Sequence, residues 1–168
     1  MTVNAYQATV PAFIQILTAL SAILTKAQAH AEAKKIDPSV FVNARIAPDM
    51  FPLARQVQIA SDQAKGACAR LAAIDIPSFA DTETTFPELQ ARIAKTLDFI
   101  KGLKPAQFDG AFDRNVTLKI AGQDMSWKGD VYLHQFALPN FYFHVTAAYA
   151  ILRHNGVEVG KRDFLGSF

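Results

Sequence analysis

The 168-residue chain has one cysteine, one tryptophan and only a small excess of positive charge. A single cysteine, Cys68, excludes an internal disulfide and any Cys-x-x-Cys metal or redox motif. Small apolar residues surround it at helical spacing, which favours a buried core residue over a reactive thiol. The formal net charge is +2 and the basic residues are scattered along the chain. This charge pattern argues against nucleic-acid binding.

The sequence also lacks the common catalytic and nucleotide-binding motifs. No Walker A loop, Rossmann fingerprint or ordered Ser-His-Asp set occurs. The apolar stretch from Phe13 to Leu24 is similar to the apolar region of a signal peptide. A signal peptide also needs basic residues before that region, but no Lys or Arg precedes Lys26, and Gln15 interrupts the apolar run. It is too short and too mixed for a membrane span. We therefore expect the first helix of a cytoplasmic protein that has no membrane contact.

Core-forming residues are abundant. Hydrophobic residues make up 51% of the chain and charged residues 19%, enough to bury a sizeable core without disulfides or metal. No internal repeat, low-complexity tract or domain boundary is present. The composition predicts a single domain over residues 1–168.

Apolar residues recur with helical spacing in four long segments. The first two helices are predicted from about Tyr6 to Ala33 and from Met50 to Ala73, with Asp49 as the cap of the second. Thr85 and Glu88 form a capping box at the start of the third helix, which Gly102 ends.

The periodicity changes after the third helix. The segment 115–120 alternates like a half-buried strand, 121–123 turns the chain and 124–128 pairs back. A further helical segment over 131–137 is predicted to bend or break at Leu138-Pro139 before the last helix, which ends at Asn155-Gly156. The pattern predicts an all-α bundle of four helices with a β-hairpin inserted between the third and fourth.

Candidate chemistry is concentrated on the last helix. Asn140 and His144 are four residues apart and share a helical face, and His134 precedes the predicted bend. Histidine is the commonest metal ligand, and an amide oxygen or water can complete a site. For both His134 and His144, a hydrogen-bonded histidine in the core is the more frequent explanation. His30 and His154, near helix ends, are more simply explained by the helix dipole.

Two further groups have ordinary structural explanations. The aromatic residues of the last helical region favour core and subunit contacts over a ligand cage. Lys161-Arg-Asp163 is interpreted as a solvated tail, anchored by Phe164 and Leu165, although it also suits an anion or a partner chain.

Several segments together resemble one bacterial protein family. They are Arg45-Ile-Ala-Pro-Asp-Met-Phe51, Gln56-Val-Gln58, Leu138-Pro-Asn-Phe-Tyr-Phe-His144, Ala148-Tyr-Ala-Ile-Leu-Arg-His-Asn-Gly-Val157 and Gly160-Lys-Arg-Asp163. On these segments the sequence is similar to the uncharacterised DUF1993 family, and the resemblance covers nearly the whole chain. That family is grouped with the DinB/YfiT-like metalloenzymes.

The resemblance implies a fold and a metal site. DinB/YfiT-like proteins are four-helix bundles, often homodimers, and members hold a divalent metal with three histidines. One lies on the second helix and two lie four residues apart on the last. At the matching places this chain has His144 and Asn140, with Asp49 or Gln56 near the second helix. This set implies a weaker site for zinc or nickel, because amide oxygens are poor donors to such metals.

Two functions remain open at this point. The first is a non-catalytic bundle, or one that binds a small molecule, with a degenerate metal site. The alternative is a metal-dependent thiol transferase or hydrolase that uses the His144 cluster. The incomplete ligand set favours the first, and no catalytic residue can be assigned.

Overall fold

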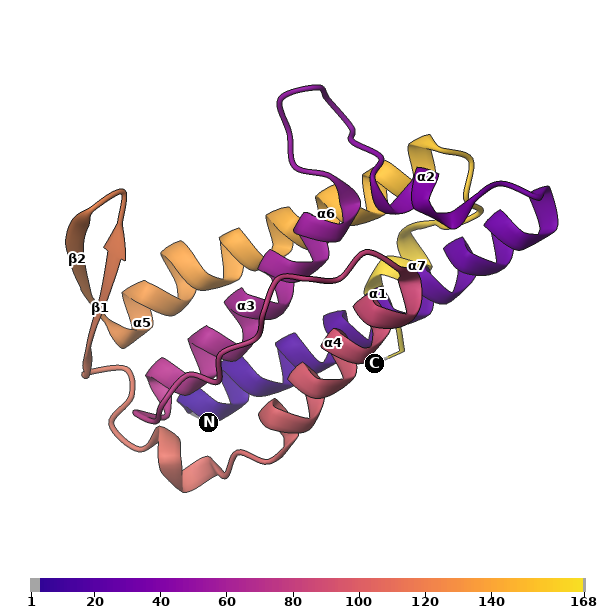
Figure 1. Ribbon diagram of the computed structural model, residues 1–168. Helices are drawn as coiled ribbons and strands as arrows, with labels where there is room; N and C mark the ends of the chain where they lie inside the picture. The colour runs from indigo at the N-terminus through magenta and orange to yellow at the C-terminus, as the bar shows by residue number, and fades with distance from the viewer. Residues whose placement is uncertain (1–3, 168) are drawn as a thin grey trace.

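The computed structural model describes residues 4–167, which are mostly helical with one small antiparallel sheet. Four long helices lie side by side (Figure 1): α1 (Ala5–Lys34), α3 (Leu53–Leu71), α4 (Phe86–Lys101) and α6 (Leu138–His154). Helices α1 and α3 contact each other, and each contacts both α4 and α6. The shorter elements are α2 (Pro38–Val42), a 3-10 turn at Pro105–Phe108, α5 (Gly129–Val131) and α7 (Lys161–Leu165).

The first helix forms where its apolar spacing predicts, and it buries Phe13, Leu17 and Leu20 completely. Phe13 meets Phe141 of α6 edge to face, with ring centroids 4.8 Å apart. By length and composition α1 is apolar enough to cross a membrane, so the expectation that this stretch is too short was wrong. Half of its most apolar window is buried within the protein. Burial in the core therefore explains the apolar character of this helix.

The second long helix begins later than predicted. It starts at Leu53 with Pro52 as the preceding residue, in an extended conformation. A residue before proline is disfavoured in the helical region, so the helix cannot extend back through Phe51. The prediction of Asp49 as its cap is wrong, since Asp49 lies in a turn of the α2–α3 loop.

The capping box of α4 is confirmed. Thr85 Oγ1 accepts from the Glu88 amide at 3.4 Å, and Glu88 Oε2 accepts from the Thr85 amide at 3.0 Å. These two bonds satisfy amide hydrogens that have no partner within the helix. Gly102 follows the last helical residue, as expected.

The chain does not break at Pro139, where the sequence predicts a bend or a break. From Gly129 to His154 the chain is continuously helical, with a π-helical stretch over Tyr132–Ala137 between α5 and α6 (Figure 1). The wider π turns lie directly before the proline, where an α-helix would need the amide hydrogen that proline lacks. The helix ends as predicted at Asn155, followed by Gly156 at a φ of 86°.

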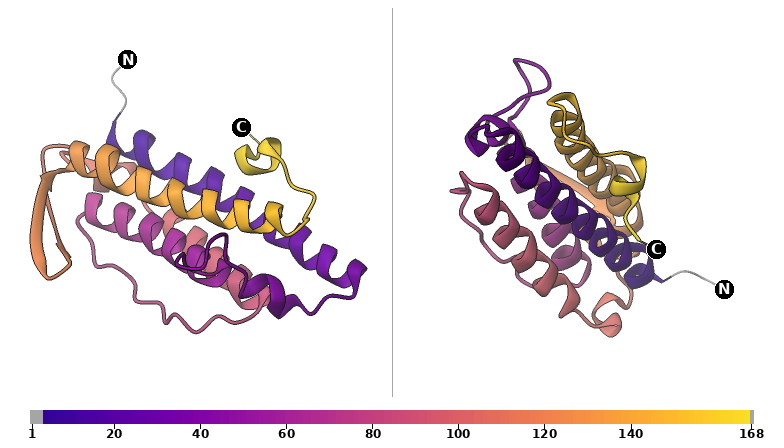
Figure 2. Two further views of the ribbon diagram at one scale, coloured as in Figure 1. Left: turned by 90° about the horizontal axis from the view of Figure 1, so that it is seen from above. Right: turned by 90° about the vertical axis from the view of Figure 1, so that its right-hand side faces the viewer.

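The predicted hairpin is confirmed as β1 (Asn115–Ile120) and β2 (Gln123–Lys128), paired antiparallel. Its two turn residues, Ala121 and Gly122, both have positive φ, as a tight hairpin turn requires. The hairpin projects beyond the helices at the end where α5 begins (Figures 1 and 2). It packs on them near its base, where Val116 is buried in the core and Trp127 stacks on Phe136 at 5.5 Å.

Cys68 is buried within α3, as expected. Burial raises the pKa of its thiol far above the ordinary value. The thiol therefore stays protonated and behaves as a small apolar core group.

Candidate functional site

His144 is a nearly buried histidine at the interface between α6 and α3. It lies in the second turn of α6 and is 9% exposed. Its Nδ1 is 2.7 Å from Oε1 of Gln56, which lies in the first turn of α3 and is 1% exposed. The Gln56 amide nitrogen donates in turn to the carbonyl oxygen of Phe51 at 3.1 Å. The three groups form a chain of hydrogen bonds that links α6 to the α2–α3 loop.

This chain determines which ring nitrogen of His144 carries the proton. The Phe51 carbonyl can only accept, so the NH₂ group of Gln56 must face it and Oε1 must face His144. Nδ1 is therefore the donor, and Nε2 of the neutral ring carries the lone pair. Nε2 has no hydrogen-bond partner among residues 4–167 and is not among their fully buried unpaired atoms. An open acceptor thus remains at the protein surface.

The environment of His144 also keeps the ring neutral. Burial lowers the pKa of His144 below its ordinary value, and the positive charge of Arg55 on α3 lowers it further. Burial disfavours the charged imidazolium because less water can solvate it. At neutral pH the residue is therefore an uncharged acceptor.

The surface beside His144 is apolar. Phe143 stands edge-on to the imidazole at 5.2 Å and is 57% exposed, and Phe51 is 52% exposed. A cavity of about 350 Å³ lies between the α2–α3 loop and α6. Its lining residues are Ile46, Met50, Tyr142, Phe143, Thr146, Ala147 and Ala150. Two of these lining residues, Phe143 and Ala147, are close neighbours of His144 along α6, whereas His144 itself does not line the cavity.

Of the predicted site residues, the structure brings His144 and Gln56 together. Asn140 is half-buried one turn before His144 on α6, and Asp49 is exposed in the α2–α3 loop. No hydrogen bond or ion pair joins either of them to His144 within the described residues.

The available donors do not fit a zinc or nickel site. Among residues 4–167 no three His, Cys, Asp or Glu side chains gather closely enough to hold a metal ion. Both polar atoms of the Gln56 amide are already used, by His144 and by Phe51. Nε2 of His144 and the amide of Asn140 remain on one face, and neither carries charge. Structural and catalytic zinc sites use at least three protein ligands of higher affinity.

His134 and His30 make local contacts away from this site. His134 is exposed, and its Nδ1 lies 2.8 Å from the carbonyl oxygen of Asp130. The prediction of His134 as a core residue is therefore wrong. His30 packs edge to face on Phe41 at 5.8 Å.

A charge cluster around the buried Arg92 side chain could not be found from the sequence. The Arg92 side chain, on α4, is 1% exposed, and its guanidinium contacts Asp62 of α3 at 2.8 Å. It also contacts Asp81 at 2.8 Å and Glu83 at 3.0 Å, both in the segment between α3 and α4. Burial lowers the pKa of Arg92, but the Glu83 hydrogen bond and the nearby carboxylates raise it by more. The cluster holds the α3–α4 segment against both helices.

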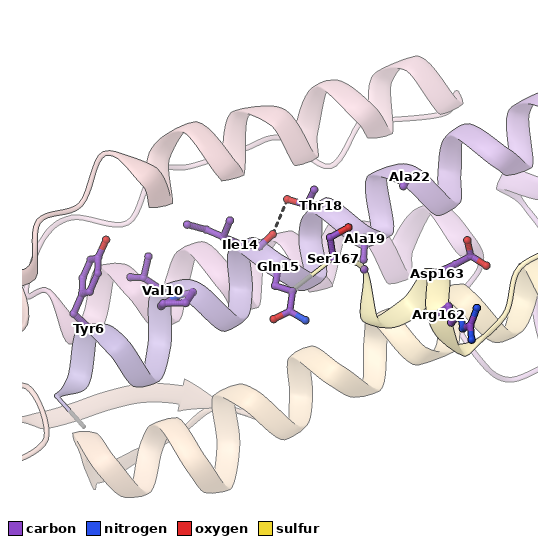
Figure 3. A pocket seen from close by; sticks show the side chains of 12 residues that line it. Tyr6, Val10, Ile14, Gln15, Thr18, Ala19, Ala22, Arg162, Asp163 and Ser167 are labelled. Carbon is purple, nitrogen blue, oxygen red and sulfur yellow. Dashed lines mark hydrogen bonds between the residues drawn. The ribbon is translucent and has the colours of Figure 1, made fainter. Parts of the chain in front are cut away.

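A second cavity, of about 710 Å³, lies between α1 and the C-terminal segment (Figure 3). Tyr6 stands toward one end of it, and Arg162 and Asp163 toward the other. Lys26 binds Asp163 at 2.6 Å and lowers the pKa of that carboxylate. Phe164 packs against Tyr149, with ring centroids 6.0 Å apart, which agrees with an aromatic anchor for the tail.

The fold places the chain among DinB-like proteins. The crystal structure of a DinB family member protein from Shewanella denitrificans is similar to it, with a TM-score of 0.91 and 45% sequence identity. The match covers 97% of this chain and 92% of that one. A family model for DUF1993, a domain of unknown function, matches residues 5–165. The chain therefore belongs to the DUF1993 family, as its sequence motifs predict. No curated protein matches it.

Proposed function

We propose that this protein is a non-catalytic, ligand-binding member of the DinB-like proteins, and that its four long helices form their four-helix bundle. The ligand site is the open Nε2 of His144 together with the apolar cavity beside it. The observation that carries the proposal is the 2.7 Å contact between His144 and Gln56. It fixes the neutral tautomer and leaves Nε2 free to accept a hydrogen bond from a ligand.

The site chemistry defines the ligand class. A neutral, nearly buried acceptor selects a ligand that donates one hydrogen bond. The cavity walls are mostly apolar, and the two exposed rings of Phe51 and Phe143 add aromatic surface. A compact apolar molecule with a single hydroxyl or similar donor satisfies both features.

Phenol and anisole test this proposal, because they share an aromatic ring and only phenol can donate. We expect phenol to bind more tightly than anisole and to shift the ring signals of His144 in nuclear magnetic resonance spectra. The His144→Ala variant should lose this preference, whereas His134→Ala, which changes an exposed histidine just before α6, should keep it. An equal affinity for both probes in the wild-type protein would refute the proposal.

The alternative function is a metal-dependent enzyme that uses the His144 cluster. The observation in its favour is that metal-binding histidines commonly donate their other ring N–H to a fixed acceptor, as Nδ1 does here. The uncharged and incomplete donor set opposes it. Elemental analysis of the purified protein, with His144→Ala as the control, separates the two functions. Stoichiometric metal that is lost in the variant would favour the enzyme.

A further inference from the structure

The hairpin offers an open edge. Its sheet has only two strands, so the outer edge of β2 has no strand partner within residues 4–167. The hairpin stands away from the helices, and most of β2 is exposed (Figures 1 and 2). A two-stranded ribbon of this kind is only marginally stable in water, and an open strand edge tends to pair with another strand.

The backbone geometry shows which groups point outward. The Gly129 amide donates to the Arg114 carbonyl at 2.9 Å, next to the register pair Asn115–Lys128. Hydrogen-bonded pairs alternate along an antiparallel ladder. The pairs that exchange hydrogen bonds across the hairpin are therefore Val116–Trp127, Leu118–Met125 and Ile120–Gln123. The N–H and C=O groups of Asp124, Ser126 and Lys128 then face away from β1.

We propose that β2 pairs antiparallel with β2 of a second copy of this chain, about a two-fold axis at Ser126. The product is a four-stranded sheet across the two protomers. Each outward group of Asp124, Ser126 and Lys128 finds a backbone partner in this register. Asp124 lies opposite the partner's Lys128, and the partner's Asp124 lies opposite Lys128.

The side chains favour this register over its neighbours. A two-fold axis at Met125 or at Trp127 would also place outward-facing residues of the two β2 strands opposite each other. The axis at Met125 would place Asp124 opposite the partner's Ser126, and the axis at Trp127 would place Lys128 opposite it. Only the axis at Ser126 pairs opposite charges, and it does so twice. Opposite charges on facing strand positions are favourable, and like charges are not.

The apolar face of the hairpin supports a second copy as the occupant. Val116, Leu118, Met125 and Trp127 point to one side of the sheet. Val116 is buried and Leu118 and Trp127 pack against the core of the same chain, so the exposed part of this face is Met125, which is 42% exposed. In the proposed register Met125 lies opposite the partner's Trp127 and the apolar faces of both hairpins continue into each other. Exposed ion pairs contribute little affinity. The role of the two Asp124–Lys128 pairs is therefore to select the partner and the register. We expect a dimer that dissociates on dilution.

A proline scan of the two edges tests the interface. Ser126→Pro removes an outward N–H that the hairpin itself does not use, at an edge position where proline is tolerated. Thr117→Pro is the matched control, because Thr117 pairs with Ser126 and its N–H faces the outer edge of β1. In analytical ultracentrifugation over a dilution series, Ser126→Pro should be monomeric and Thr117→Pro should dimerise like the wild type. Circular dichroism verifies that both variants are folded.

Charge reversal tests the register. Asp124→Lys places a new lysine opposite the partner's Lys128. Lys128→Asp places two carboxylates opposite each other. Each variant alone should therefore dimerise at least tenfold more weakly than the wild type. Mixed together, the two variants form two Lys–Asp pairs and should associate as a heterodimer. A wild-type protein that stays monomeric at all concentrations would overturn the proposal. So would a dimer that Ser126→Pro does not weaken, or a mixture of the charge variants that fails to associate.

Discussion

Nδ1 of His144 and Oε1 of Gln56 lie 2.7 Å apart although 88 residues separate them in the sequence. The contact joins α6 to α3 inside a largely apolar interface, where an unpaired polar group would be costly. It also fixes one tautomer of the imidazole, which turns a core histidine into an oriented acceptor. The same hydrogen bond therefore serves both the packing of two helices and the chemistry of the candidate site.

The first prediction concerns stability and pH. The pKa of His144 in the folded protein is lowered from its ordinary value of 6.5. Between the folded and unfolded pKa values the unfolded chain binds more protons, so the free energy of unfolding falls as pH falls. The contribution of the neutral His144 to the free energy of unfolding is complete above about pH 6.5. It is lost as the pH falls toward the pKa of His144 in the folded protein. Urea unfolding at a series of pH values from 8 to 5 measures this slope.

The control for this prediction is a variant without the titrating group. His144→Phe should show a shallower decline between pH 7 and pH 5, whereas His134→Phe, at an exposed position, should match the wild type. Identical slopes for the wild type and His144→Phe would contradict the assigned origin of the pH dependence.

The second prediction concerns Gln56. Gln56→Leu leaves the Nδ1 hydrogen of His144 and the Phe51 carbonyl without their partner. Loss of a buried hydrogen-bond partner costs about 1–3 kcal/mol, so we expect a loss of about 2 kcal/mol in urea unfolding. Gln63→Leu, on the same helix and with no side-chain hydrogen bond to any residue within 4–167, should change stability by less than about 0.5 kcal/mol. Equal losses in both variants would refute a specific role for Gln56.

The third prediction concerns Arg92. Arg92→Met removes the cation that Asp62, Asp81 and Glu83 share. Breaking a buried ion pair by removing one partner costs about 3–5 kcal/mol. We expect the lower end, about 3 kcal/mol, because two of the three carboxylates remain partly hydrated.

Arg92→Lys serves as the comparison for Arg92→Met. It keeps the charge but not the forked geometry, so its loss should be intermediate. Thermal unfolding measures both variants, and cleavage by a protease between residues 74 and 84 should increase in Arg92→Met. Unchanged protease resistance there would show that Arg92 does not hold the segment.

The fourth prediction concerns Gly129, where β2 passes into α5. A Cβ atom at this position would lie 2.0 Å from the carbonyl oxygen of Ala111, a backbone atom that cannot rotate away. Gly129→Ala should therefore destabilise the protein by about 3 kcal/mol, at the upper end of ordinary overpacking effects. Gly160→Ala, where a Cβ would meet nothing within 4 Å, should be nearly neutral. Calorimetry on both variants provides the test, and a neutral Gly129→Ala would contradict this packing.

Local sequence signals predicted the parts of the fold that depend on neighbouring residues. The Thr85–Glu88 capping box and the hairpin are examples, since their hydrogen bonds join residues close in sequence. The behaviour of Pro139 was not predictable, because the π turns before it depend on how the whole helix packs. Propensity rules describe an isolated proline in an α-helix and therefore favour a bend or a break.

The candidate site was predictable in part. His144 and Gln56 follow from the family motifs, but their direct contact depends on the relative position of two helices. The position of Asp49 relative to the site was not predictable, because a loop residue next to Pro48 can lie near the site or away from it. The Arg92 cluster carries no local signal at all, since one of its carboxylates lies 30 residues away on α3 and the other two lie in the segment before α4.

The tautomer of His144 tests the central claim most directly. Nitrogen-15 spectra of the histidine rings distinguish a protonated from an unprotonated ring nitrogen. At pH 7 we predict that Nδ1 of His144 is protonated and Nε2 is not, and that addition of phenol shifts the Nε2 signal. A proton on Nε2, or a charged ring at this pH, would contradict the open acceptor on which the proposed ligand site depends.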